Sequence, residues 1–173
     1  MRIARIRRIA LAAALTAVAL TIFIIEAAIP APAPVPGIKL GLSNIVTIFA
    51  LYILGPKIAL AVLVCRILLG GFLAGQPVSI IYSLSGGLAA FLFAALTYEK
   101  FPKKQIWVLS SLSAVIHNLA QITVAVLVTG TSGLFLYAPV LVTSGIITGA
   151  FTGITAQALL FRLVKNGTVS YYH

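Results

Sequence analysis

The chain contains no aspartate, and Glu26 and Glu99 are its only acidic residues. This scarcity excludes enzymes that hold magnesium ions between clustered carboxylates. The sequence also lacks a phosphate-binding loop with its lysine, which excludes a P-loop ATPase. Because Cys65 is the single cysteine, an internal disulfide and a cysteine-based metal cluster are impossible, and its apolar neighbours predict a buried thiol. One histidine among apolar segments and no clustered acids make a poor metal site, so we expect no metal or cofactor.

Charged residues of either sign are scarce: 8% of the chain is charged and 61% is hydrophobic, with a mean hydropathy of +1.16. A soluble domain carries about 25% charged residues, so lipid must be the solvent of this chain. We therefore predict an all-α integral membrane protein with a single transmembrane domain over residues 1–173. The net charge of +10 comes from short basic runs beside apolar segments, without interleaved aromatic residues. These runs favour orientation in a membrane over nucleic-acid binding.

Six apolar segments predict a bundle of six transmembrane helices, at about residues 9–29, 40–54, 58–73, 78–98, 106–128 and 134–164. The first segment follows four arginines and resembles a signal peptide, but its apolar run is longer than a usual signal core, so we expect a retained helix. Four prolines between residues 30 and 36 then predict a stiff, extended connection. The second segment is short for a spanning helix, so we expect part of it to be tilted or unwound.

Basic residues mark alternate connections between these segments. With the N-terminus in the cytoplasm, the inner loops and the C-terminal end carry Lys57, Lys100, Lys103, Lys104, Arg162 and Lys165. The outer loops carry a single basic residue, Lys39. This is the positive-inside pattern, and it predicts a multi-pass protein of the bacterial cytoplasmic membrane with both termini in the cytoplasm.

Small residues recur at a spacing of four in the first and last segments, which lets helix backbones approach closely in lipid. They are Ala10 and Ala14, Ala13 and Ala17, and the series Gly145, Gly149 and Gly153. We expect the glycine series to pack within this chain. For the alanine pairs, packing within the chain and docking to another membrane subunit both stay open.

Polar side chains within predicted spans are costly, and they are therefore candidates for substrate binding. The candidates are Glu26, Lys39, Asn44, Arg66, Tyr82, His117, Asn118 and Gln121. Glu26 and Lys39 either snorkel to the outer surface or contact a ligand. Arg66 lies mid-span and either bonds to helix-end carbonyls or serves function. His117 and Gln121 are four apart on one helix face, where they form either structural hydrogen bonds or part of a polar pocket.

One arrangement unites these residues. Lys39 and Arg66 would hold an acidic or phosphate-bearing group, since a cation pairs strongly with such a group. The imidazole and amide groups at residues 117–121 would orient the remainder of the molecule. The apolar surroundings would suit a ring or a prenyl tail.

Five blocks carry a family resemblance: Pro36 to Asn44, Leu54 to Lys57, Cys65 to Gly70, Tyr82 to Gly87, and His117 to Gln121. Together they resemble the Gx transporter family, whose members often carry the name heptaprenyl diphosphate synthase component I. The missing aspartates speak against a catalytic meaning of that name. The family is similar in turn to the S components of energy-coupling factor (ECF) transporters, which are six-helix proteins that capture vitamins or metals from outside.

The resemblance implies partners as well as a fold. S components dock through small residues of their first helix onto a transmembrane coupling subunit with two ATPases, and the alanine pairs match that pattern. The connection through Lys39 resembles the loop that covers the ligand in such proteins. We therefore expect a non-enzymatic, substrate-binding membrane subunit for uptake of a small acidic or amphipathic molecule, such as a vitamin, quinone or isoprenoid precursor. The alternatives are a membrane accessory of prenyl diphosphate or quinone biosynthesis, and a structural scaffold in a redox complex.

Overall fold

The computed structural model describes residues 2–27, 41–73, 75 and 77–172. Over these residues the chain forms six α-helices, two short 3₁₀ helices and turns, without a strand. The elements are α1 (Arg2–Ala27), α2 (Asn44–Leu54), α3 (Pro56–Leu73), α4 (Pro77–Thr97), η1 (Lys103–Gln105), α5 (Ile106–Thr129), η2 (Ser132–Tyr137) and α6 (Ala138–Lys165). The predicted all-α bundle of six helices is therefore confirmed.

Five of the helices in the described ranges, α1, α3, α4, α5 and α6, are long and apolar enough to cross a membrane. The protein is thus a multi-pass membrane protein. The second predicted span, over residues 40–54, is helical only from Asn44 to Leu54. Its 11 residues extend over about 16 Å, roughly half the ~30 Å hydrocarbon core, so α2 does not cross on its own.

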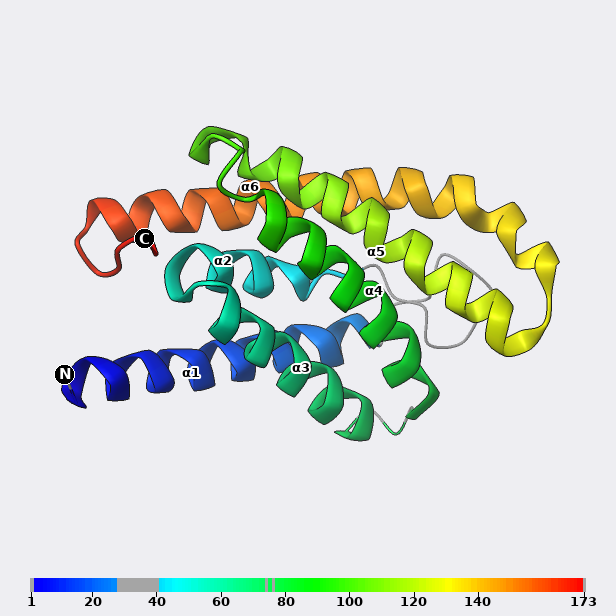
Figure 1. Ribbon diagram of the computed structural model, residues 1–173, viewed down its shortest axis with the longest axis horizontal. Coiled ribbons are helices and arrows are strands. Elements are labelled where there is room, and N and C mark those ends of the chain that lie inside the picture. The colour runs from blue at the N-terminus through cyan, green and yellow to red at the C-terminus, as the bar shows by residue number, and fades with distance from the viewer. Residues whose placement is uncertain (1, 28–40, 74, 76, 173) are drawn as a thin grey trace.

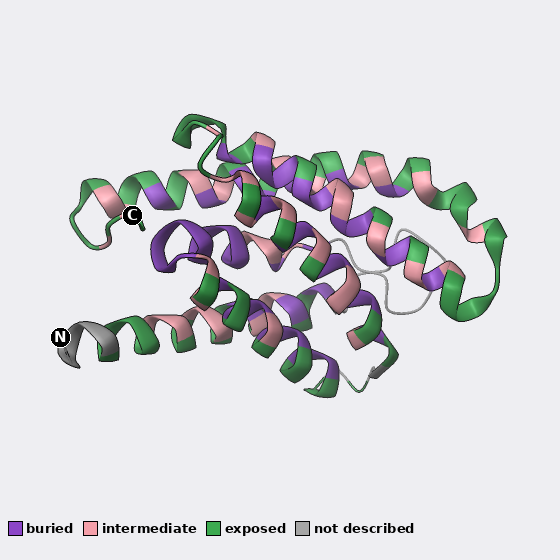
Figure 2. Ribbon diagram, viewed as in Figure 1, coloured by how far each residue is buried: buried purple, intermediate pink, exposed green. Residues whose placement is uncertain are grey.

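Helix α2 is the centre of the bundle. It contacts all five other α-helices, and its residues from Val46 to Leu54 are buried on every side. Figure 2 shows it as an almost continuously buried helix among partly exposed ones. Turns at Gly41 and Gly55, with φ of +80° and +81°, lie on either side of it, and Pro56 starts α3 directly after the second turn. The beginning of α2 therefore lies inside the protein, near the middle of its long axis (Figure 1).

The predicted glycine series joins α6 to α5. A Cβ atom at Gly149 would lie 2.5 Å from the Cα of Ser111, and one at Gly153 would lie 2.5 Å from the Cα of Trp107. Gly145 faces Ala114 and Asn118 in the same way. The two backbones are thus in direct contact, as expected for small residues at a spacing of four.

Helix α1 lies at the edge of the bundle, where it packs against α2 and α3. Its four predicted docking residues, Ala10, Ala13, Ala14 and Ala17, are all exposed, so they do not pack within this chain. The expectation of a buried Cys65 is wrong, because α3 turns this side chain outward. An outward thiol in an apolar run faces lipid in a membrane protein.

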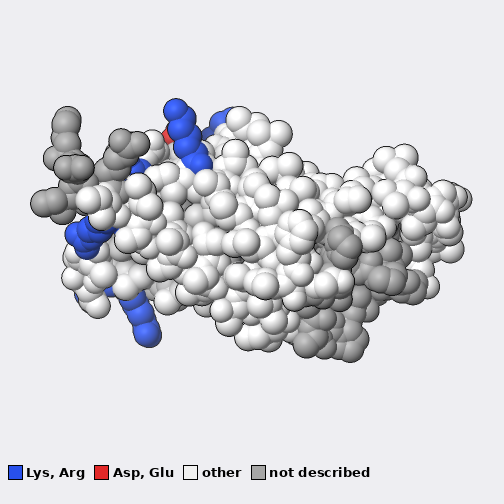
Figure 3. Space-filling view, turned by 90° about the horizontal axis from the view of Figure 1, so that it is seen from below, with Lys and Arg blue, Asp and Glu red and all other residues white. Residues whose placement is uncertain are grey.

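Both described chain ends lie at one end of the molecule (Figure 1). Lysines and arginines gather at that end, as Figure 3 shows from below. We call it the basic end, and its described residues are Arg7, Arg8, Lys57, Lys100, Lys103, Lys104, Arg162 and Lys165.

The segment after α6 folds back over the basic end. The N–H of Tyr172 donates to the carbonyl of Tyr52, at 2.8 Å, and the Tyr172 ring lies 5.7 Å from the Arg8 guanidinium carbon. Arg8 in turn donates to the carbonyl of Leu54, at 2.8 Å. These contacts hold the C-terminal segment, the end of α2 and the start of α1 together.

Candidate functional site

A buried arginine organises a polar cluster where α2 begins. Arg66, on α3, is only 2% exposed. One of its terminal nitrogens donates to Ser43 Oγ, and the other donates to Asn44 Oδ1 at 2.8 Å. Since arginine only donates, this bond turns the Asn44 amide nitrogen toward His117, where it lies 3.4 Å from Nδ1. His117 Nδ1 then acts as acceptor, which leaves the ring proton on Nε2.

Glu26, near the end of α1, contacts the same region from the other side. Its Oε1 accepts a hydrogen bond from the N–H of Gly41, and the N–H groups of Leu42 and Ser43 also face this carboxylate. The charge of Arg66 acts on it as well. A carboxylate is favourable at this position because the positive end of the α2 dipole lies there. Glu26 is 3% exposed, so the alternative in which it snorkels to the surface is wrong.

The polar residues of α5 divide between two neighbouring helices. His117 and Gln121 share one face, as their spacing predicts, and both lie against Gly86 of α4. A Cβ at Gly86 would approach Gln121 Cγ to 2.8 Å and His117 Cδ2 to 3.1 Å. Asn118 faces α6 instead, where its Nδ2 donates to the carbonyl of Leu141 at 2.7 Å.

Several buried polar atoms of this region have no hydrogen-bond partner among the described residues. They are Glu26 Oε2, Arg66 Nε, Asn118 Oδ1, and both Oε1 and Nε2 of Gln121. Gln121 is wholly buried. Such groups are rare in folded proteins because each lost hydrogen bond costs about 1–3 kcal/mol. Their concentration on four side chains distinguishes this region as a candidate binding site.

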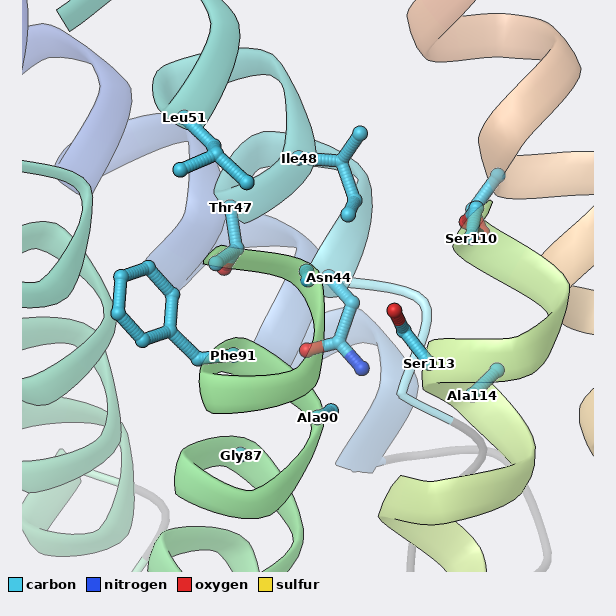
Figure 4. Close-up of a pocket in the computed structure, with 12 residues that line it drawn as sticks. Asn44, Thr47, Ile48, Leu51, Gly87, Ala90, Phe91, Ser110, Ser113 and Ala114 are labelled. Carbon is cyan, nitrogen blue, oxygen red and sulfur yellow. Dashed lines mark hydrogen bonds between the residues drawn. The ribbon is translucent and has the colours of Figure 1, made fainter. Parts of the chain in front are cut away.

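A cavity of about 20 Å³ lies beside the cluster, between α2, α4, α5 and α6 (Figure 4). Asn44 lines it and so belongs to both cavity and cluster. Thr47 and Ser113 also line it, and their hydroxyl oxygens have no partner in the described structure. The volume fits about one water molecule, whereas sites for drug-sized ligands measure about 300–1,000 Å³. A larger ligand therefore requires the surrounding helices to separate.

The structure brings together most of the predicted site residues. Glu26, Asn44, Arg66 and His117 form the cluster, and Gln121 lies next to His117 against α4. Whether these residues bind a substrate stays a prediction.

Two of the predicted residues that the structure describes, Asn118 and Tyr82, are not joined to the cluster, since Asn118 faces α6. Lys39 lies outside the described residues, so its predicted pairing with Arg66 is not tested. Tyr82 packs away from the cluster, against Ile122, Ala125 and Leu141.

Sequence reasoning missed Ser43, the backbone of residues 41–43, and the cavity hydroxyls of Thr47 and Ser113. The available signal was Ser43 before Asn44, a polar pair of the kind that starts helices. This pair lies where α2 begins, at Asn44, whereas the apolar segment read from hydropathy begins at residue 40.

Replacing Asn118 with alanine tests the tie between α5 and α6. We expect a loss of about 1 kcal/mol in the free energy of unfolding, because the Leu141 carbonyl loses a buried donor within the membrane. Thr123→Ala is the matched control, since the exposed Thr123 hydroxyl bonds only to a carbonyl of its own helix. Unfolding in mixed micelles measures both variants, and equal stabilities would contradict the role given to Asn118.

The fold and the cluster define a class: a multi-pass helical membrane protein with charged and amide side chains buried inside its bundle. Within this class the chain belongs to the heptaprenyl diphosphate synthase component I family, whose model matches residues 15–159. No curated protein and no solved structure matches the chain. The family assignment agrees with the resemblance seen in the sequence blocks, and its description names a component of heptaprenyl diphosphate synthase.

Proposed function

We propose that this protein is a non-catalytic, substrate-binding membrane subunit that takes up a small acidic or amphipathic molecule. The observation that supports it best is the buried cluster around Arg66, with unpartnered polar atoms on neighbouring side chains. A charged group within the membrane is costly to maintain and is retained most readily where it contacts a substrate. The apolar walls of the adjoining cavity suit the remainder of an amphipathic molecule.

The position of the cluster favours uptake from the side opposite the basic end. Glu26 lies in the last turn of α1, away from the end where both chain ends lie (Figure 1). The positive-inside rule assigns the basic end to the cytoplasm of a bacterial cell. A ligand would then enter from outside, contact Arg66 and His117, and leave inward after a rearrangement of the helices.

A separate ATPase module of the ECF type would supply the energy for this rearrangement, because the sequence has no nucleotide-binding loop of its own. The surface for such a partner is the exposed alanine face of α1, formed by Ala10, Ala13, Ala14 and Ala17. Small side chains allow another membrane helix to approach closely. Helix α1 contacts α2 and α3 through its other sides, so this alanine face is exposed.

The family description favours a second candidate function. A component of heptaprenyl diphosphate synthase would present a prenyl diphosphate to a soluble enzyme partner. This role demands a binding face at the cytoplasmic end or a groove open to lipid. The cluster instead lies between buried faces of α2, α3 and α5, which fits a ligand enclosed by the bundle better.

Native mass spectrometry of the protein, extracted gently from its host membrane, tests the proposal. We expect a bound small molecule that is lost from folded Arg66→Gln and His117→Ala variants. Arg162→Gln is the matched control, because Arg162 is exposed at the basic end, and this variant should retain the molecule. A protein without bound molecule that co-purifies with a prenyl diphosphate synthase would refute uptake and establish the accessory role.

A further inference from the structure

The start of α2 has the features of an anion site. The N–H of Gly41 donates to Glu26, the N–H groups of Leu42 and Ser43 also act on this carboxylate, and the α2 dipole adds partial positive charge there. Because α2 begins inside the bundle, these groups are shielded from water: Gly41 and Ser43 are both buried. Shielding strengthens their attraction for a negative group.

Arg66 provides the second, independent feature of this site. Its guanidinium contacts Ser43 and Asn44, the residues at the first turn of α2, and its Nε–H has no partner in the described structure. A guanidinium presents five donors in a planar fork that suits the oxygens of a carboxylate or a phosphate. The three N–H groups and this fork together offer more donors than one side-chain carboxylate satisfies.

Glu26 occupies this position incompletely. Its Oε1 accepts from the Gly41 N–H, while its Oε2 is buried without a partner in the described part of the chain. A carboxylate that fully belonged to the site would use both oxygens. The fit indicates a donor set built for a larger or differently placed anion, with Glu26 as a partial substitute.

Glu26 also belongs to the helix that is least integrated into the bundle. Among the described elements, α1 packs against α2 and α3, while the strong packing of α4, α5 and α6 does not involve it. The outer part of α1 exposes Val18, Ile24 and Ile25, and among the described side chains of this part only Ala19, Phe23 and Glu26 are buried. A movement of the last turn of α1 away from α2 would therefore leave the contacts among α4, α5 and α6 in place.

We propose that the start of α2 and Arg66 form the binding site for a carboxylate or phosphate group of the captured molecule, and that Glu26 competes with this group for the site. That the anion is the captured molecule rests on the proposed function. The existence of the anion site does not depend on it. Binding of the cargo displaces Glu26, and the return of Glu26 with α1 favours release. The substrate class is thus an anionic molecule.

Removal of Glu26 should expose this competition. In nanodiscs of zwitterionic lipid, we expect Glu26→Ala to bind acetate and inorganic phosphate about tenfold more tightly than the unchanged protein, because the competing carboxylate no longer fills the site. Glu26→Gln, which keeps the bulk but not the charge, should gain less. The double variant Glu26→Ala/Arg66→Gln should lose the gain.

Glu99→Ala is the matched control, since it removes the only other acidic side chain and changes the net charge equally. It should bind both anions like the unchanged protein. Where Glu26→Ala is poorly folded, its melting temperature is measured instead: acetate should raise it, and neutral acetamide should not. Repeating the titration with phosphatidylglycerol in the nanodisc distinguishes two sources of the anion. If the site binds a lipid headgroup, phosphatidylglycerol should weaken the binding of acetate. If the site binds only soluble anions, the affinity for acetate should stay the same.

Unchanged anion affinity in a folded Glu26→Ala variant, or a melting temperature that acetate does not raise, would overturn the proposal. If that result is found but the native protein still carries a molecule that is lost from Arg66→Gln, the proposed uptake function is supported and the anion site is refuted. If Glu26→Ala binds acetate more tightly than the unchanged protein, while the native protein carries no molecule and co-purifies with a synthase, the anion site is supported and the uptake function is refuted.

Discussion

Substitution of Arg66 by glutamine is expected to lower the free energy of unfolding by about 1–3 kcal/mol, since it removes a buried positive charge that acts on the buried Glu26 carboxylate and leaves buried polar groups without a donor. It also removes the donors to Ser43 and Asn44, which hold the start of α2 against α3. Unfolding by detergent titration in mixed micelles, followed by circular dichroism, measures the loss. Arg162→Gln, at an exposed arginine, should stay within about 0.5 kcal/mol of the unchanged protein.

The double variant Glu26→Gln/Arg66→Gln separates charge compensation from simple loss of packing. With both charges removed, no uncompensated ion is buried, so we expect the double variant to be more stable than Arg66→Gln alone. The same recovery would not occur if Arg66 acted only through its bulk. Stability of Arg66→Gln close to that of the unchanged protein would show that Glu26 and Arg66 do not depend on each other.

The number and type of helices followed from the sequence because lipid imposes a simple rule. A span must be apolar, and its backbone must be bonded internally, so hydropathy alone locates α3, α4 and α5 closely. For the second segment, residues 40–54, the same rule predicted only that some part is tilted or unwound, and the structure shows that the helix begins at Asn44. Residues 40–43 are apolar enough to extend a hydropathy segment, yet Gly41 has φ of +80° and starts the turn before α2. Hydropathy does not register backbone conformation, and for this reason it could not place the turn at Gly41 or show that the helix start lies inside the bundle.

The candidate site was predictable in its members but not in its pairings. Arg66, Asn44 and His117 were recognisable because polar groups are costly in a membrane. Their partners depend on the rotation and depth of helices that are far apart in sequence. The expected partner of Arg66 was Lys39, as a second cation around an acidic ligand. Lys39 lies outside the described residues, so that expectation stays a prediction. The structure adds the buried Glu26, whose charge acts on Arg66, and this became visible only from the way that α1 and α2 meet.

The contact between α5 and α6 leads to the second large effect. We expect Gly149→Ala and Gly153→Ala each to lower the free energy of unfolding by about 1–3 kcal/mol, and the double variant to lower it further. At both positions a Cβ would lie 2.5 Å from a backbone Cα of α5, and backbone cannot turn aside as a side-chain end can. The two helices must therefore separate, against the gain in helix propensity of alanine over glycine.

Two other glycines provide matched controls for this separation. A Cβ at Gly87, in α4, would meet the Cδ1 ends of Ile67 and Leu63, at 3.0 and 3.3 Å, which can rotate away. Gly133 has open space around it. Gly87→Ala and Gly133→Ala should therefore change stability little, as measured by the same detergent titration. Equal losses at Gly149 and Gly87 would contradict direct backbone contact, because the cost would then follow from glycine itself and not from what it touches.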